Sequence, residues 1–178
     1  MQYTTDAEVY KERYPKAKMI CPEPCVEKLK EQEMRIDSTV EETFKKGNQY
    51  GIKVHKPPLK KKYTEYIYEV PLSNGEKALI CNEIILNVDQ NVKRNFLFKI
   101  LNYFYDVEGN GEDPHISYGY RKVTHTSSFD LINFWVDFAQ YITFSYKSSH
   151  PITVATVSHS KEIVGDLDSK FRNLSRKI

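Results

Sequence analysis

The chain has 178 residues, which is the size of one ordinary domain and too short for two full-sized hydrophobic cores. Apolar residues make up 40% of the sequence and charged residues 28%, a composition that favours a folded protein over a disordered chain. The net charge of +2, from 26 basic and 24 acidic residues, excludes the strong overall field with which some proteins bind nucleic acid indiscriminately. Any basic surface must therefore be local.

The cysteine content and the N-terminal residues favour an intracellular protein. Three cysteines are far from the even, dense set of a secreted disulfide scaffold, and the first residues contain no apolar stretch typical of a secretory signal. The most apolar stretch, residues 129–146, is interrupted by polar side chains and falls short of the roughly 20 residues that span a bilayer. We therefore expect no transmembrane segment.

The first 24 residues predict an extended N-terminal arm. They are polar and contain three of the chain's eight prolines, a composition that fits a segment outside the core. One short helix fits near residues 6–14. We expect the rest of the chain, residues 25–178, to form a single domain.

A helical segment is predicted over residues 25–46. Apolar side chains recur there at helical spacing, and Gly47 suits the end of a helix. Ser38 and Glu41 match a capping box, the pattern in which two side chains bond to the backbone at the start of a helix. A break at residues 37–38 would therefore divide this segment into two consecutive helices.

Two alternating segments predict a β-hairpin over residues 63–88. Residues 63–72 and 76–88 flank Ser73, Asn74 and Gly75, in which Asn-Gly is a strong hairpin signal because both turn positions need positive φ. One set of alternate residues in the second strand is the more apolar, and we expect it to face the core. This set is Ala78, Ile80, Ile84, Leu86 and Val88.

Further helices and strands follow the hairpin. The apolar patterns predict a largely buried helix starting at Asp89, a strand over residues 115–124, a mostly enclosed helix after Ser127, a strand over residues 151–157 and a helical segment from Ser160 onward. The helix after Ser127 has one polar stripe, formed by Asp130, Asn133, Asp137 and Gln140. So much apolar helix surface implies either that both faces of the sheet are covered or that some of it contacts a partner.

The order of these elements predicts an α+β fold. We expect a small mixed sheet of about four strands packed with helices, preceded by the N-terminal arm of residues 1–24. The domain of residues 25–178 would then consist of the helical segment 25–46, a basic loop 45–62 and a sheet and helix core 63–178.

The predicted basic loop is the clearest charge feature. Residues 45–62 contain seven lysines and no acidic residue, with two prolines in the middle. Lysines contact phosphate and tyrosines stack on bases, so the loop is a candidate surface for nucleic acid. An acidic protein or a lipid is the alternative partner, and a solvated surface the simplest interpretation. The candidate residues are Lys53, His55, Lys56, Lys60, Lys61, Lys62 and Tyr63.

Residues 115–118, with the sequence His-Ile-Ser-Tyr, resemble the His-x-Ser element of the two-histidine phosphoesterases, in which two such elements surround a phosphodiester. The resemblance covers these four residues, and a second element is missing at a suitable distance. On a straight strand four polar residues would share one face, suited to acid–base chemistry or phosphate binding, and the alternative is an outward sheet face. These candidates are His115, Ser117, Arg121 and His125.

Two further patterns concern metals. Residues 106–111 resemble the first half of a calcium-binding loop, but position twelve is Ser117 instead of a bidentate glutamate, so a solvated acidic turn is the favoured interpretation. Cys21 and Cys25 are close in sequence, but a structural zinc site needs four ligands, so a local disulfide or two free thiols are the simpler interpretations. We expect neither a metal nor a cofactor. The calcium candidates are Asp106, Glu108 and Asn110.

None of these patterns specifies a reaction. The arm, the excess of apolar helix surface and the heptad-like C-terminal spacing favour a non-catalytic structural or accessory subunit of a larger multi-protein assembly. It would dock on other protein subunits through the arm and the apolar helix surfaces. One alternative is an RNA- or nucleic-acid-binding module that uses the basic loop, and another is a small phosphoesterase-like hydrolase that uses His115 and His125. The lack of a nucleophile–base motif argues against an enzyme.

Overall fold

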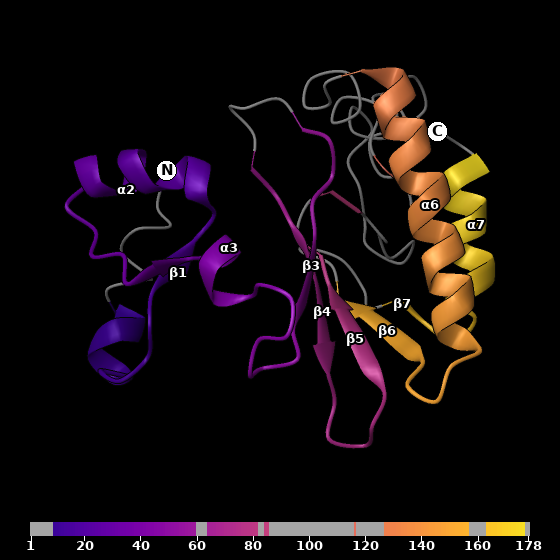
Figure 1. Cartoon of the computed structure of the whole chain (residues 1–178), viewed down its shortest axis with the longest axis horizontal. Helices are drawn as coiled ribbons and strands as arrows, with labels where there is room; N and C mark the ends of the chain where they lie inside the picture. The colour runs from indigo at the N-terminus through magenta and orange to yellow at the C-terminus, as the bar shows by residue number, and fades with distance from the viewer. Residues whose placement is uncertain are drawn as a thin grey trace, which may run out of the picture. The chain divides into compact units, whose positions relative to one another are not determined.

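The computed structural model describes residues 9–59, 64–81, 84–85, 116, 127–156 and 163–176. The chain divides into two compact units, Met1–Gly51 and Ile52–Ile178, and each is described here by itself (Figure 1). The arm of residues 1–24 and the single domain that follows it remain a prediction.

The first unit consists of short helices and one pair of very short strands. Residues 9–13 are helical, at the position of the short helix predicted in the arm. Strand β1 (Ile20–Cys21) pairs in parallel with β2 (Ser38–Thr39). The helices that follow these strands are η1 (Glu23–Cys25) with α2 (Val26–Glu31), and α3 (Val40–Thr43).

The predicted interruption of the helical segment is present, but the capping box lies one residue later than expected. Thr39 Oγ1 accepts a hydrogen bond from the backbone N–H of Glu42 (3.1 Å), and the Glu42 carboxylate accepts one from the N–H of Thr39 (3.2 Å). Both Ser38 and Thr39 pair with β1, so the strand extends to Thr39 and the helix begins at Val40. The capping box of Ser38 and Glu41 was therefore wrong, because strand pairing uses Ser38.

The second unit contains a mixed sheet, which confirms the α+β fold. Within the described residues the order of its five strands is β3-β4-β5-β6-β7. The β5–β6 pair is parallel and the other neighbouring pairs are antiparallel. The strands are β3 (Lys53–His55), β4 (Ile67–Pro71), β5 (Lys77–Ile80), β6 (Ile152–Thr156) and β7 (Ile163–Val164).

Two strands lie where the sequence predicted other structure. Strand β3 is inside the predicted basic loop, because residues 53–55 pair with the edge of β4. Strand β7 lies inside the predicted C-terminal helical segment, so helix α7 (Leu167–Arg176) begins later than Ser160. Strand β6 confirms the predicted strand of residues 151–157. The predicted strand 115–124 and the helix starting at Asp89 lie outside the described residues, apart from Ile116, which is buried.

The β4–β5 hairpin is confirmed around the predicted loop of residues 73–75, but its strands are shorter than expected, since residues 64–66 are not a strand and residues 84–85 form a turn and a bend. The backbone N–H of Gly75 donates to the carbonyl of Leu72 (3.1 Å). The backbone N–H of Leu72 donates to the carbonyl of Glu76 (2.8 Å), and this bond closes the hairpin. Gly75 has a φ of +84°, whereas Asn74 has no positive φ. This is the common arrangement of a tight turn followed by one left-handed residue, so only the glycine is conformationally required.

The expected inward face of β5 was wrong in part. Leu79 and Cys81 belong to the core, whereas Ile80 is 45% exposed. Leu79 pairs with Glu69 on β4, and Glu69 lies on the face of the sheet that is covered by helix, so the register places Leu79 on that face too. Alternation within one strand identified two faces but did not show which one the helices cover.

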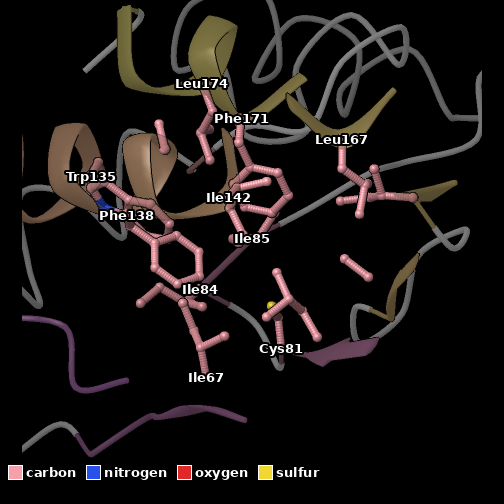
Figure 2. Close-up of a cluster of buried hydrophobic side chains, with 14 of the residues drawn as sticks. Ile67, Cys81, Ile84, Ile85, Trp135, Phe138, Ile142, Leu167, Phe171 and Leu174 are labelled. Carbon is pink, nitrogen blue, oxygen red and sulfur yellow. The ribbon is translucent and has the colours of Figure 1, made fainter. Parts of the chain in front are cut away.

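Helices α6 (Ser128–Tyr146) and α7 pack against each other and both contact β6 (Figure 1). The predicted start of α6 is confirmed, since Ser127 Oγ accepts a hydrogen bond from the N–H of Asp130 (3.0 Å). The core lies between these two helices and the sheet (Figure 2). Its fully buried large side chains include Ile67, Leu79, Trp135, Ile142, Phe171 and Leu174.

Candidate functional site

The outer face of α6 carries four exposed, large apolar side chains. Phe129 and Phe144 are each 72% exposed, Ile132 is 41% exposed and Val136 is 37% exposed. The expectation that this helix is mostly enclosed was therefore wrong on its outer side. We call these four residues the α6 outer row.

Helical geometry explains why the outer row forms one surface. Residues three, four and eight positions apart lie on the same side of an α-helix. Successive members of the row have these spacings: three from Phe129 to Ile132, four from Ile132 to Val136, and eight from Val136 to Phe144. The row spans about 22 Å along the helix axis, at 1.5 Å per residue. The opposite side of α6 supplies core residues such as Trp135, Phe138 and Ile142. Helix α6 is thus apolar on two sides, and the fold buries only one of them.

Polar residues border and interrupt the outer row. The four residues of the predicted polar stripe are all exposed, as expected: Asp130, Asn133, Asp137 and Gln140. By helical spacing, Asn133 and Gln140 lie between the members of the row. Apolar side chains mixed with uncharged polar ones are typical of the surface that one protein buries against another.

A buried carboxylate lies on the inner side of α6. Glu69 on β4 is only 3% exposed and has three partners. Tyr141 on α6 donates a hydrogen bond to Glu69 Oε2 (2.6 Å), and His55 Nε2 lies 3.2 Å from the same oxygen. Lys77 Nζ on β5 lies 2.8 Å from Glu69 Oε1. The cluster therefore joins three strands to the helix through one carboxylate.

The electrostatics of this cluster indicate structural stabilisation and not acid–base chemistry. Burial raises the pKa of Glu69, but hydrogen bonds from His55, Lys77 and Tyr141, with the charge of Lys77, outweigh burial and lower the pKa to about 2. Burial and the adjacent Glu69 carboxylate raise the pKa of Tyr141. Near neutral pH the carboxylate therefore stays ionised and the phenol stays protonated, and neither is a ready proton donor or acceptor.

The structure brings two of the predicted partner-binding residues into the cluster. His55 packs against the rings of Phe138 and Tyr141, with centroid distances of 4.9 and 5.1 Å. Lys53 Nζ lies 3.8 Å from the centroid of the Tyr141 ring. Both side chains therefore contact α6; His55 is half-buried there, whereas Lys53 remains exposed. Lys56 Nζ lies 5.1 Å from the Tyr66 ring centroid.

The remaining predicted site residues lie outside the described residues. They are the basic residues Lys60, Lys61 and Lys62 with Tyr63, the catalytic candidates His115, Ser117, Arg121 and His125, and the calcium candidates Asp106, Glu108 and Asn110. Within the described part of the chain, no group of three or more His, Cys, Asp or Glu side chains could hold a metal ion. Cys21 and Cys25 are free thiols.

Sequence reasoning did not identify Glu69 or Tyr141. A usable signal was present, because Glu69 lies two residues after the buried Ile67, and residues two apart in a strand share one face. A carboxylate on a buried face requires hydrogen-bonding partners, and these come from β3, β5 and α6. The sequence predicted β5 beside β4, but it did not show that β3 pairs with the other edge of β4 or that Tyr141 reaches this face.

Comparison of the chain with protein-family models, curated proteins and solved structures gave no match. Over the residues that the structure describes, no helix combines the length and apolarity needed to cross a membrane.

Proposed function

We propose that the protein is a non-catalytic subunit of a larger multi-protein assembly and that the α6 outer row contacts another protein subunit. The observation that carries this proposal is the exposure of Phe129, Ile132, Val136 and Phe144 along one side of a helix whose other side is core. Burying one such side chain contributes about 1.5–3 kcal/mol relative to leaving it exposed. A partner with a complementary apolar surface would therefore gain substantially from covering the row.

The partner that best fits this row is a protein surface with an apolar ridge along its length, such as a second helix. The row is narrow, follows the helix axis, and is interrupted by uncharged polar residues that suit the edges of an interface. Anchoring aromatic residues commonly dominate such contacts, and Phe129 and Phe144 lie at the two ends of the row. Docking by the N-terminal arm is part of the same proposal, and the exposed Val9 and Tyr10 support it.

The nucleic-acid alternative has less support. His55 is half-buried against Glu69 and Tyr141, so one of its candidate residues is engaged within the second unit, whereas Lys53 contacts the Tyr141 ring and remains exposed. A loop that binds phosphate needs its cationic groups at the surface, a condition that Lys53 meets and His55 does not. The hydrolase alternative depends on residues outside the described part of the chain.

A comparison of variants tests the assembly proposal. The tagged full-length protein is purified from its native extract at low and high salt, alongside the double variant Phe129→Ser/Phe144→Ser and the control Ile80→Ser, which removes an exposed apolar side chain of β5 outside the row. We expect the wild type and the control to retain a stoichiometric, salt-resistant set of protein subunits and the double serine variant to lose it. A serine variant that retains the same set, or a wild type with no stoichiometric partner, would contradict the proposal.

A further inference from the structure

A cavity of about 410 Å³ lies within the first unit. Its volume is near the lower end of the roughly 300–1,000 Å³ typical of clefts that bind small molecules. The residues around it come from the helical residues 9–13 and the segment after them, from β1, from α2 and from residues 34–36.

The walls of this cavity are mostly apolar and adaptable. Leu29 and Ile36 supply branched aliphatic surface, and Met19 and Met34 supply flexible thioethers that adjust to ligands of irregular shape. Cys21 is a buried free thiol whose pKa is raised by burial and by the nearby Cys25 and Glu41, so it stays protonated near neutral pH and acts as further apolar wall. An apolar body would therefore be favoured inside.

Among the described residues, the charged side chains that line the cavity are both basic. They are Lys11 and Lys18. Lys11 also donates to the carbonyl of Ala17, and its Nζ lies 3.4 Å from Asp37 Oδ2, so part of its charge is compensated. Lys18 is exposed and adds a further positive charge. The charge at the cavity therefore favours an anion over a cation.

We propose that this cavity binds an amphiphilic carboxylate, a molecule with an apolar chain or ring body and one anionic head. The body would occupy the space between Leu29, Met34 and Ile36, and the head would lie near Lys18. This binding site is separate from the α6 outer row, which belongs to the other unit, although it shares Tyr10 with the arm surface proposed for docking.

The test uses the full-length protein and two ligands of matched chain length. Dodecanoate and dodecyltrimethylammonium, which differ in the sign of the head group, are titrated below their micelle-forming concentrations by isothermal titration calorimetry. We expect saturable binding of dodecanoate and much weaker binding of the cation. The absence of saturable dodecanoate binding, or equal binding of the two ligands, would overturn the proposal.

Variants then locate the site. Ala17→Trp should abolish dodecanoate binding by filling the cavity. Lys18→Glu should weaken it by about three- to tenfold, the effect expected for reversing one exposed charge. Lys28→Glu on α2 changes the net charge equally, does not line the cavity and should leave binding unchanged. Equal effects of Lys18→Glu and Lys28→Glu, or unchanged binding by a folded Ala17→Trp variant, would contradict the site.

Vesicles test whether the protein recognises anionic lipid head groups in a membrane instead of a free amphiphilic carboxylate. Liposomes of phosphatidylcholine with phosphatidylserine present anionic head groups but no free amphiphile. Binding to these vesicles without binding to free dodecanoate would replace the cavity proposal with a surface interaction. Dodecanoate binding that is lost in Ala17→Trp and vesicle binding that is absent would support the cavity.

Discussion

The Tyr141 hydroxyl donates a 2.6 Å hydrogen bond to Glu69 Oε2, and this contact joins helix α6 to the middle of strand β4. The same carboxylate binds His55 on β3 and Lys77 on β5. One charged group therefore fixes the helix relative to three neighbouring strands. Because the inner side of α6 is fixed in this way, its outer side and the apolar row on it face away from the core.

The stability of the second unit should depend on acid pH through Glu69. The pKa of this carboxyl lies at about 2 in the folded protein and at 4.5 in an unfolded reference. Its contribution is thus fully present above pH 4.5 and is lost as the pH falls from 4.5 towards 2, by up to about 3 kcal/mol. Chemical unfolding followed at several pH values between 2 and 6 measures this loss.

A Glu69→Gln variant provides the control for that dependence. It should be less stable than the wild type at pH 6, because Lys77 loses its charged partner, and its stability should change less between pH 5 and pH 2. Other carboxyl groups contribute to the acid response of both proteins, so the difference between them is the relevant quantity. Parallel pH profiles for wild type and variant would show that Glu69 is not held in the ionised form.

Tyr141→Phe should destabilise the protein by about 1.5–3 kcal/mol, the range for a hydrogen bond to a charged group. The substitution keeps the ring that contacts Lys53 and His55 and removes only the hydroxyl that Glu69 accepts from. It should also raise the pKa of Glu69, which shifts the acid transition to higher pH. Tyr50→Phe, at an exposed position, is the matched control. An equal change in the two melting temperatures would argue against the role of Tyr141.

The parts of the fold that local patterns determine could be predicted from the sequence. The β4–β5 hairpin, strand β6 and the start of α6 depend on nearby residues, namely Gly75 in the loop and Ser127 at the cap. Strand β3 could not be predicted, because three residues become a strand only by pairing with β4, and the lysines around them suggested a loop. The same holds for the two residues of β7.

The exposure of the α6 outer row could not be predicted from the sequence either, because it too depends on tertiary packing. The periodicity of α6 showed a nearly all-round apolar helix with one polar stripe, but not which apolar side the sheet would cover. Trp135 and Ile132 are equally apolar in the pattern, yet one is buried and the other is 41% exposed. The positions of the sheet and of α7 decide which side of α6 is buried, and local sequence patterns do not show these positions.

The three cysteines should differ in their reaction with thiol reagents. Cys81 is buried, and burial with the nearby Glu65 raises its pKa, so little thiolate forms near neutral pH. Cys21 is also buried with a raised pKa, whereas Cys25 is half-buried. Brief labelling of the native protein with iodoacetamide, followed by peptide mass spectrometry, should find Cys25 modified first. Equal labelling in the native state, with denatured protein as the reference, would be inconsistent with this burial.

Gly75→Ala should destabilise the β4–β5 hairpin by about 1–2 kcal/mol, the cost of placing an ordinary side chain in the left-handed region. The φ of Gly75 is +84°, and an added Cβ would lie 3.9 Å from His150 Nδ1, an ordinary contact distance. The loss should therefore come from the backbone and not from a clash. Gly75→Asn, a larger residue that tolerates positive φ, should lose less stability than Gly75→Ala when both are compared by thermal unfolding. A larger loss for asparagine would mean that space around the loop, and not its backbone geometry, sets the requirement for glycine.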